Sequence, residues 1–175
     1  MDGGNTVISQ ATEDDGATLY ALIVAMGFTK EQDYFERCLD DQAAGGRTIL
    51  LARHGGQAAG YAMLNWKPPY ALYKRLGIPE IQDLNVVPEM RRCGVATALI
   101  RHCEDLARGK GLSDIGISVG LDSGYGAAQR LYVKLGYIPD GHGVTYDRQA
   151  VKWGEIRPID DDLCLMLLKK MVISE

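Results

Sequence analysis

The order of hydrophobic and polar residues predicts a succession of short strands and helices. Residues 94–109 carry the strongest helical pattern, because their apolar side chains recur every three or four positions and form one stripe. Residues 125–135 repeat this pattern, and Gly136 follows at a position where a glycine commonly ends a helix. Runs of β-forming residues predict strands at 6–11, 48–53, 57–65, 81–87, 115–121, 137–138 and 163–171.

Two further helices are predicted near the N-terminus, before the first hairpin. Thr12 and the acidic residues after it favour the start of a helix that ends near Met26, and a polar helix is predicted over 30–42. A Gly-rich turn at 54–56 then joins two strand-like runs into a hairpin. Helices followed by a hairpin disfavour a pure βαβ array.

Two segments lack a clear period and are predicted to be loops. Residues 67–79 contain three prolines, with one helical turn expected at 70–76. The second loop follows residue 138 and includes the aspartates at 160–162. Since the 175 residues show no repeat and no linker, we expect a single domain over 1–175 with a sizeable core.

Charge and hydropathy narrow the class of partner. A net charge of -4 lacks the excess of lysine and arginine on which nucleic-acid binding depends, so no nucleic-acid partner is expected. No apolar run approaches the ~20 residues that cross a bilayer, so no membrane partner is expected either. Residues 1–5 lack the basic and apolar start of a secretion signal, and a cytoplasmic location is expected. The sequence leaves open whether the protein forms a homodimer.

The four cysteines do not predict a metal or disulfide site. They lie far apart in the sequence, form no CxxC pair and have no histidine at ligand spacing. We therefore expect reduced, isolated thiols and no metal.

The most informative stretch is the junction between the strand at 81–87 and the helix at 94–109. The first turn of a helix has unpaired N–H groups and a partial positive charge, so this junction is suited to an anion such as a phosphate. Gly94 lets the backbone come close, Ala96 keeps the next turn small, and Thr97 offers a hydroxyl. Arg91 and Arg92 add positive charge. A solvent-exposed strand-to-helix turn is the alternative.

Other phosphate motifs fit the sequence less well. The pattern GxxxxGK[ST] is absent, and residues 124–129 begin like a GxGxxG fingerprint but lack its third glycine. A Rossmann-type nucleotide binder is therefore a weak alternative.

Two motifs in order resemble those of the GNAT acetyltransferase family. Arg91-x-x-Gly94-x-Ala96 is similar to the family's [Q/R]-x-x-G-x-[G/A] motif, which binds the pyrophosphate of acetyl-CoA. Residues 128–137, read as A-x-x-L-Y-x-K-x-G-Y, resemble the family's second motif. The resemblance covers nearly the whole chain and implies a GNAT-like acyl-CoA N-acyltransferase fold of the α/β (α+β) class, with a mixed, mostly antiparallel sheet flanked by helices.

The resemblance also implies which residues bind acetyl-CoA. Val86 and Val87 would pair with the pantetheine arm, and the backbone of the following loop and helix would hold the pyrophosphate. That second group comprises Arg91, Arg92, Cys93, Gly94, Val95, Ala96 and Thr97. Ala128 belongs to the second motif, and Tyr125 stands where many relatives have asparagine, so it is expected to stack on the CoA arm or to pack beside it instead.

Tyr132 aligns with the tyrosine that often protonates the departing CoA thiolate in this family. A phenol with a pKa near ~10 stays protonated at neutral pH and can donate to a sulfur that gains negative charge. Tyr132 also belongs to an apolar helical stripe, so a half-buried core residue is the alternative.

The amine must lose a proton before it attacks, and the central strand offers two acids as bases. Glu80 stands where the histone-acetylating branch of the family carries its glutamate base. Asp83 lies nearer to the reacting segment, and burial among apolar neighbours would raise its pKa. A water relay, simple attraction of a cationic substrate and a solvated acid are the alternatives.

The acceptor site is expected to come from the variable segments. Trp66, Tyr70 and Tyr73 are candidates for an aromatic wall, with a loop anchored on the core as the alternative. The aspartates at 160–162 are candidates to meet a cation, with a solvated turn as the alternative. The expected activity is acetyl transfer from acetyl-CoA to the primary amine of a small cationic molecule. A protein or peptide amine, and a non-catalytic acyl-CoA-binding module, are the alternatives.

Overall fold

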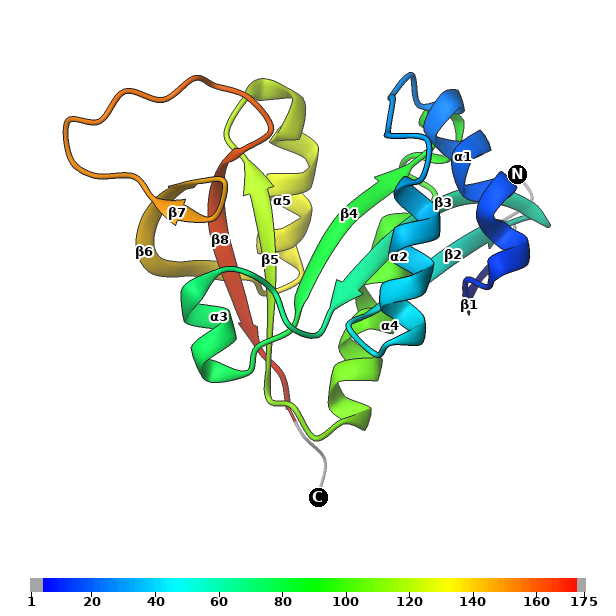
Figure 1. Ribbon diagram of the computed structural model, residues 1–175, viewed down its shortest axis with the longest axis horizontal. Coiled ribbons are helices and arrows are strands. Elements are labelled where there is room, and N and C mark those ends of the chain that lie inside the picture. The colour runs from blue at the N-terminus through cyan, green and yellow to red at the C-terminus, as the bar shows by residue number, and fades with distance from the viewer. Residues whose placement is uncertain (1–4, 173–175) are drawn as a thin grey trace. The chain divides into compact units, whose positions relative to one another are not determined.

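The computed structural model describes residues 5–172, and its internal contacts divide the chain into two units (Figure 1). The first unit combines the residues up to 66 with 81–105, and the second combines 67–80 with the residues from 106 onward. The single domain over 1–175 stays a prediction. The expected cytoplasmic location rested partly on residues 1–4, which lie outside the described residues.

The first unit is built on the strands β1 (Thr6–Gln10), β2 (Arg47–His54), β3 (Gln57–Asn65) and β4 (Glu80–Val86), in that order. β1 pairs with β2, and β2 with β3, both antiparallel, so the predicted hairpin around the turn at 54–56 is confirmed. Glu80 itself is counted with the second unit.

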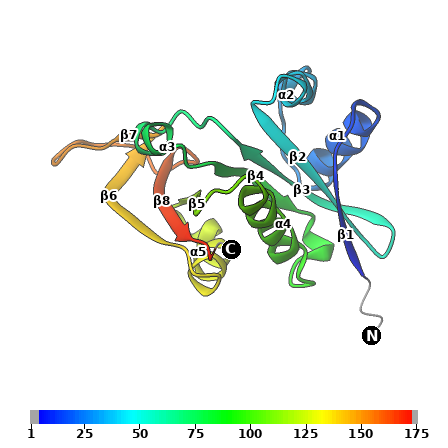
Figure 2. The same ribbon diagram turned by 90° about the horizontal axis from the view of Figure 1, so that it is seen from below.

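Helices cover both faces of this sheet. After the short 3-10 turn η1 (Glu13–Asp15), α1 (Gly16–Ala25) and α2 (Tyr34–Ala43) lie on one face, and α4 (Val95–Gly109) lies on the other (Figure 2). Side chains of α1 and α2 form a core with those of β2 and β3; its fully or nearly fully buried members include Leu19, Phe35, Ile49, Leu51, Tyr61 and Met63.

The predicted helix at 30–42 begins four residues late, at Tyr34. The Tyr20 hydroxyl lies within hydrogen-bond distance of the carbonyl oxygens of Glu31 and Gln32 and of the Glu36 carboxylate, which share its one proton, and it accepts from the amide of Phe35 at 3.3 Å. A side chain from α1 thus takes the Phe35 amide, which a helix begun at Lys30 would pair internally. The segment between α1 and α2 is therefore a loop that contacts α1.

The second unit contains β5 (Asp114–Gly120), β8 (Leu163–Lys170), β6 (Ile138–Tyr146) and β7 (Gln149–Ala150), in that spatial order and antiparallel throughout. Its helices are α3 (Ala71–Leu76) and α5 (Gly126–Lys134), the latter preceded by the 3-10 turn η3 (Ser123–Tyr125). Strands flanked by helices in both units confirm the α/β (α+β) class.

β6 is longer than predicted. The sequence predicts a strand only at 137–138, because residues 139–143 are polar, Gly-rich and include Pro139. Pairing with β8 nevertheless extends β6 to Tyr146, with an irregular register between Pro139 and Val144. Asp147 and Arg148, both with positive φ, then make the turn to β7.

The aromatic wall expected in the 66–79 segment is wrong for Tyr73. This side chain is fully buried, its hydroxyl donates to the carbonyl oxygen of Leu167 at 2.7 Å, and its ring lies so close to Gly116 that a Cβ there would be 2.3 Å away. Tyr70 packs edge-on against it. Residues 67–79 are therefore anchored on the core of the second unit, as the alternative interpretation held, whereas Trp66 belongs to the first unit and donates from Nε1 to the Thr48 hydroxyl at 3.0 Å.

Candidate active site

The junction between β4 and α4 has the shape of an anion-binding turn. After β4, the 3-10 turn η2 (Pro88–Met90) leads into residues 91–94, where Arg92 and Gly94 adopt positive φ values of 64° and 84°. Apart from its chain neighbours, no described atom lies within 4 Å of the position that a Cβ would take at Gly94. The glycine is therefore required by the backbone conformation and leaves open space in front of it.

The first turn of α4 suits an anion electrostatically. The amide of Ala98 donates to the carbonyl of Gly94 at 2.9 Å, so the N–H groups of residues 95–97 precede the first intrahelical bond. This turn contains no acidic residue, although helices usually favour one there. Arg91, Arg92, Cys93 and Gly94 are exposed, Val95 is buried, and Ala96 and Thr97 are half-buried. The residues fit a pyrophosphate group.

Val86 and Val87 are less free to pair with a pantetheine arm than expected. The Val87 amide donates to the carbonyl of Ala59 at 2.9 Å, and the Val87 carbonyl accepts from the amide of Met90 at 3.0 Å. Val87 therefore offers no free N–H to a ligand. The carbonyl of Val86 accepts from Arg91 Nε at 3.3 Å, which ties this arginine to the end of β4. The pairing predicted for Val86 is untested.

Tyr132 lies in α5 of the second unit, with its ring buried to 6% exposure beside Tyr137. Burial raises the pKa of Tyr132 to about 12, so the phenol is protonated at neutral pH. Within residues 5–172 no protein group forms a hydrogen bond with its hydroxyl. Every fully buried polar side-chain atom of this part does have a partner, so the Tyr132 oxygen must reach the surface.

This unpaired hydroxyl separates Tyr132 from the other tyrosines. The protein has nine, and seven of them donate the hydroxyl to a carboxylate or carbonyl oxygen, namely Tyr20, Tyr34, Tyr61, Tyr70, Tyr73, Tyr125 and Tyr146. Tyr137 also has an interaction. Unlike these seven, Tyr132 keeps its proton available to a ligand among the described residues.

Glu80 is fully buried and ion-paired. The guanidinium of Arg148 donates to its two carboxylate oxygens, from Nη2 at 3.1 Å and from Nε at 3.4 Å. Both residues belong to the second unit. A proton accepted by Glu80 would break a buried ion pair, which is costly.

Asp83 is the centre of a polar cluster in the first unit. It adopts a positive φ of 49° within β4, a conformation that aspartate tolerates better than most residues. Tyr34 and Tyr61 donate to Oδ2 at 2.8 and 2.9 Å, and Asn85 donates to Oδ1 at 2.9 Å. Burial and the charge of Asp83 raise the pKa of both phenols, which therefore stay donors.

Tyr125 and Ala128 lie at the start of α5. The Tyr125 hydroxyl donates to Asp161 at 2.8 Å, and its ring packs on Gly120, where a Cβ would be 2.4 Å away. Burial, followed by the bond to Asp161, raises the pKa of Tyr125. Ala128 is half-buried. Asp160 likewise accepts a hydrogen bond from the Tyr146 hydroxyl at 2.8 Å. Two of the three aspartates that were candidates to bind a cation therefore accept hydrogen bonds from tyrosines.

The predicted site residues fall into two groups. Asp83, the end of β4 and the loop into α4 belong to the first unit, while Glu80, Tyr125, Ala128 and Tyr132 belong to the second. Sequence reasoning missed Arg148 and the partners of Asp83, which are Lys30, Tyr34, Tyr61 and Asn85. No motif links these residues, because they come from separate segments.

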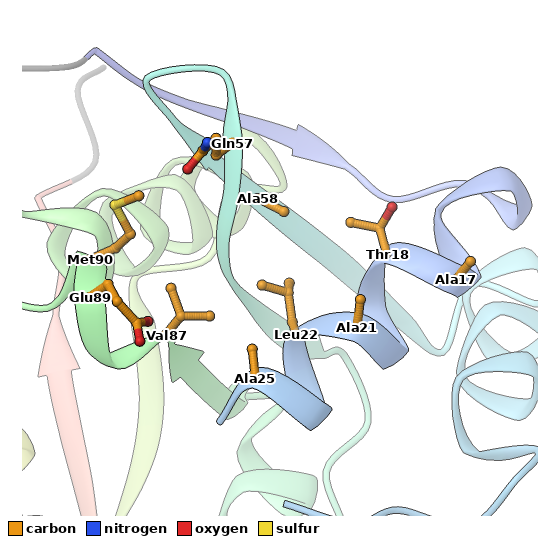
Figure 3. A pocket seen from close by; sticks show the side chains of 10 residues that line it. All are labelled: Ala17, Thr18, Ala21, Leu22, Ala25, Gln57, Ala58, Val87, Glu89 and Met90. Atoms are coloured by element: carbon orange, nitrogen blue, oxygen red, sulfur yellow. The ribbon is translucent and has the colours of Figure 1, made fainter. Parts of the chain in front are cut away.

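The first unit also contains a pocket of about 550 Å³ (Figure 3). One wall is a row of small residues of α1, which includes Ala17, Ala21 and Ala25, and the opposite wall includes Val87 and Met90. The lining does not include Asp83, so this pocket is separate from the polar cluster.

Among residues 5–172, no three histidine, cysteine, aspartate or glutamate side chains are placed to hold a metal ion. None of the helices in this described range has the length and apolar character needed to span a bilayer.

Comparison with known proteins identifies the family. The sequence description of the acetyltransferase (GNAT) family matches residues 16–137, which include both motifs. The chain therefore belongs to the GNAT family of acetyltransferases, and it is an acetyltransferase that uses acetyl-CoA. This confirms the resemblance drawn from the two motifs. The comparison with curated proteins returned no match.

Solved structures share the fold. The ribosomal-protein-S18-alanine N-acetyltransferase of Escherichia coli matches with a TM-score of 0.69 and 15% identity, over 98% of this chain and 97% of its own. The ribosomal-protein-alanine N-acetyltransferase of Brucella melitensis gives 0.68 and 19%, over 94% and 99%. The PaiA N-acetyltransferase of Thermoplasma acidophilum, solved with coenzyme A, gives 0.66 and 16%, over 95% and 99%. At these identities the likeness concerns the fold alone.

Proposed function

We propose that the protein transfers the acetyl group of acetyl-CoA to the primary amine of a small cationic acceptor, by direct attack within a ternary complex. The single observation that carries the mechanism is the Tyr132 hydroxyl, protonated and without a partner in the described chain. The amine nitrogen forms a bond to the acetyl carbon, the carbon–sulfur bond breaks, and Tyr132 donates its proton to the departing sulfur.

The loop into α4 is the proposed anchor for acetyl-CoA. The amides of residues 95–97, together with Arg91 and Arg92, would hold the pyrophosphate, and Gly94 would let the backbone approach it. Tyr125 and Ala128 would border the pantetheine arm. Because the overall net charge is -4, the positive potential at this turn has to be local.

Asp83 is the better of the two candidate proton acceptors. Its side chain is 17% exposed, whereas Glu80 is fully buried against Arg148. The proton that the acceptor ammonium loses would pass to Asp83 Oδ1, directly or through water, and then to solvent. Glu80 would instead stabilise the second unit through its ion pair with Arg148.

A thiol-release assay with acetyl-CoA and a panel of amines tests this function. The panel contains butylamine, 1,5-diaminopentane, a free amino acid and a peptide with a free N-terminus. We expect kcat/KM to be at least about tenfold higher for the small amines than for the peptide, a difference of about 1.4 kcal/mol. Preference for the peptide would favour a protein-amine acetyltransferase. CoA binding without turnover on any amine would favour the non-catalytic module.

The order of the reaction is tested by initial rates with both substrates varied. Direct attack in a ternary complex gives intersecting lines in double-reciprocal plots and no acetylated enzyme by mass spectrometry. Parallel lines and an acetyl adduct would indicate a covalent intermediate instead.

A further inference from the structure

The polar cluster around Asp83 already holds a cation. The ammonium group of Lys30, from the loop between α1 and α2, lies 3.4 Å from Asp83 Oδ1 and 4.6 Å from the centre of the Tyr34 ring. A carboxylate on one side and an aromatic face on the other are the two features that bind alkylammonium ions in proteins.

The fixed partners of Asp83 leave one position for an ammonium. Tyr34 and Tyr61 both donate to Oδ2, and Asn85 donates to Oδ1, all from residues of the first unit. Lys30 is the fourth donor, and its bond to Oδ1 is the longest of the set. The other three donors hold the carboxylate in place when the lysine leaves, because none of them depends on it.

The loop that carries Lys30 is anchored without this lysine. Gly27 adopts a positive φ of 74° after α1, and the amide of Phe28 donates to the carbonyl of Ile23 at 3.1 Å. The carbonyl of Glu31 accepts from the amide of Tyr34 at 3.1 Å, and the Tyr20 hydroxyl contacts the carbonyls of Glu31 and Gln32. The Lys30 side chain, 30% exposed, can therefore swing away while its backbone stays in place.

We propose that Asp83 and the ring of Tyr34 form the binding site for the ammonium group of a primary alkylamine acceptor, and that Lys30 occupies this site as a built-in competitor. The inference rests on the proposed function in naming the acceptor. The lysine side chain is itself an unbranched alkylammonium, so an acceptor whose amine ends a flexible chain fits in its place. The acceptor binds with reduced apparent affinity, because it must first displace Lys30.

Binding without turnover tests this site. The probe is 1,5-diaminopentane, titrated by calorimetry into the full chain saturated with CoA rather than acetyl-CoA, and 1,5-pentanediol is the uncharged control. We expect Lys30→Met to lower the Kd of the diamine about three- to tenfold, as when a competitor that occupies the site most of the time is removed. The diol is expected not to bind.

Variants of Tyr34 and a control lysine sharpen the test. In the Lys30→Met background, Tyr34→Phe retains the aromatic face and should change the Kd by less than about threefold, whereas Tyr34→Leu should weaken binding about three- to tenfold. Lys74→Met removes an exposed lysine of α3 and should leave the Kd unchanged. Asp83→Asn should abolish measurable binding, provided that circular dichroism shows it folded.

Three outcomes of the binding titrations overturn the site: no binding of the diamine to either the wild type or Lys30→Met, equal Kd values for these two proteins, or equal Kd values for Tyr34→Phe and Tyr34→Leu. The comparison of Tyr34→Phe with Tyr34→Leu keeps the test valid if Asp83→Asn does not fold.

Failure of the proposed function can be distinguished from failure of the proposed site. If the diamine binds as described but no amine is acetylated, the site stands and the function fails. If amines are acetylated with a KM that neither Lys30→Met nor Tyr34→Leu changes, the function stands and the site fails.

Discussion

The guanidinium of Arg148 lies 3.1 Å from the carboxylate of Glu80, whose side chain is fully buried. Glu80 follows the 67–79 segment, and Arg148 lies in the turn between β6 and β7. The pair therefore ties two segments of the second unit that are far apart in the sequence.

Glu80→Gln is expected to lower stability rather than turnover. Breaking a buried ion pair usually costs about 3–5 kcal/mol, and we expect roughly 2–3 here because the Arg148 side chain is 28% exposed. Urea unfolding measures this loss. Adding Arg148→Met should recover part of it, as in a double-mutant cycle. At a temperature where the variant is folded, kcat should stay within about threefold of wild type. A loss of more than about 100-fold in kcat would instead make Glu80 the general base.

Tyr132→Phe should lower kcat about 100-fold and leave CoA affinity unchanged, since it removes only a proton donor. Because burial raises the pKa of Tyr132 to about 12, the wild-type acid stays protonated up to about pH 11. Ionisation of Tyr132 should therefore cause no fall in the kcat of the wild type below about pH 11. Unaltered turnover of the variant at all pH values would remove Tyr132 from the mechanism.

Tyr73→Phe is the matched control. Its hydroxyl donates to the buried carbonyl of Leu167 at 2.7 Å, so the substitution should cost about 1–2 kcal/mol of stability and leave kcat unchanged. Tyr132→Phe, which loses no protein hydrogen bond within residues 5–172, should stay within about 0.5 kcal/mol of wild type. Comparison of the two variants thus distinguishes a hydroxyl that acts in the reaction from one that only stabilises the fold.

Gly94→Ala should weaken CoA binding about tenfold, because an alanine disfavours the φ of 84° on which the turn into α4 depends. Calorimetric titration with CoA measures the effect. Gly55→Ala, in the exposed hairpin turn with a φ of 57°, carries a similar backbone penalty of about 1 kcal/mol away from the site. It should change the Kd for CoA by less than about twofold. Equal CoA affinity for both variants would contradict the role given to the loop.

The elements that carry the motifs were predictable from the sequence. The expected helices at 94–109 and 125–135 correspond to Val95–Gly109 and Gly126–Lys134, since each has a local signal in its apolar stripe and its terminal glycine. The start of α2 and the length of β6 were not predictable. The Tyr20 side chain, which belongs to α1, determines where α2 begins, and pairing with β8 determines how far β6 extends.

The same distinction applies to the site. The loop at 91–97 was found because its contributors are consecutive and form a motif. The cluster around Asp83 was not, because Lys30, Tyr34 and Tyr61 lie 53, 49 and 22 positions away in the sequence. Sequence reasoning identified Asp83 as an acid near the reaction, but folding determines which donors surround it.

Cys103 provides a test of core packing in the first unit through the pH dependence of stability. Burial raises the pKa of this thiol from 9.0 to about 12, and the side chain is fully buried in α4. The unfolded chain loses the thiol proton near pH 9, while the folded chain retains it. The contribution of the protonated Cys103 thiol to the free energy of unfolding is therefore complete below pH 9 and is lost as the pH rises from 9 to 12. Between pH 8 and 10, wild type should lose about 1.3 kcal/mol more than Cys103→Ala, measured by urea unfolding under reducing conditions. Parallel pH dependences for the two proteins would mean that the thiol reaches solvent in the folded state.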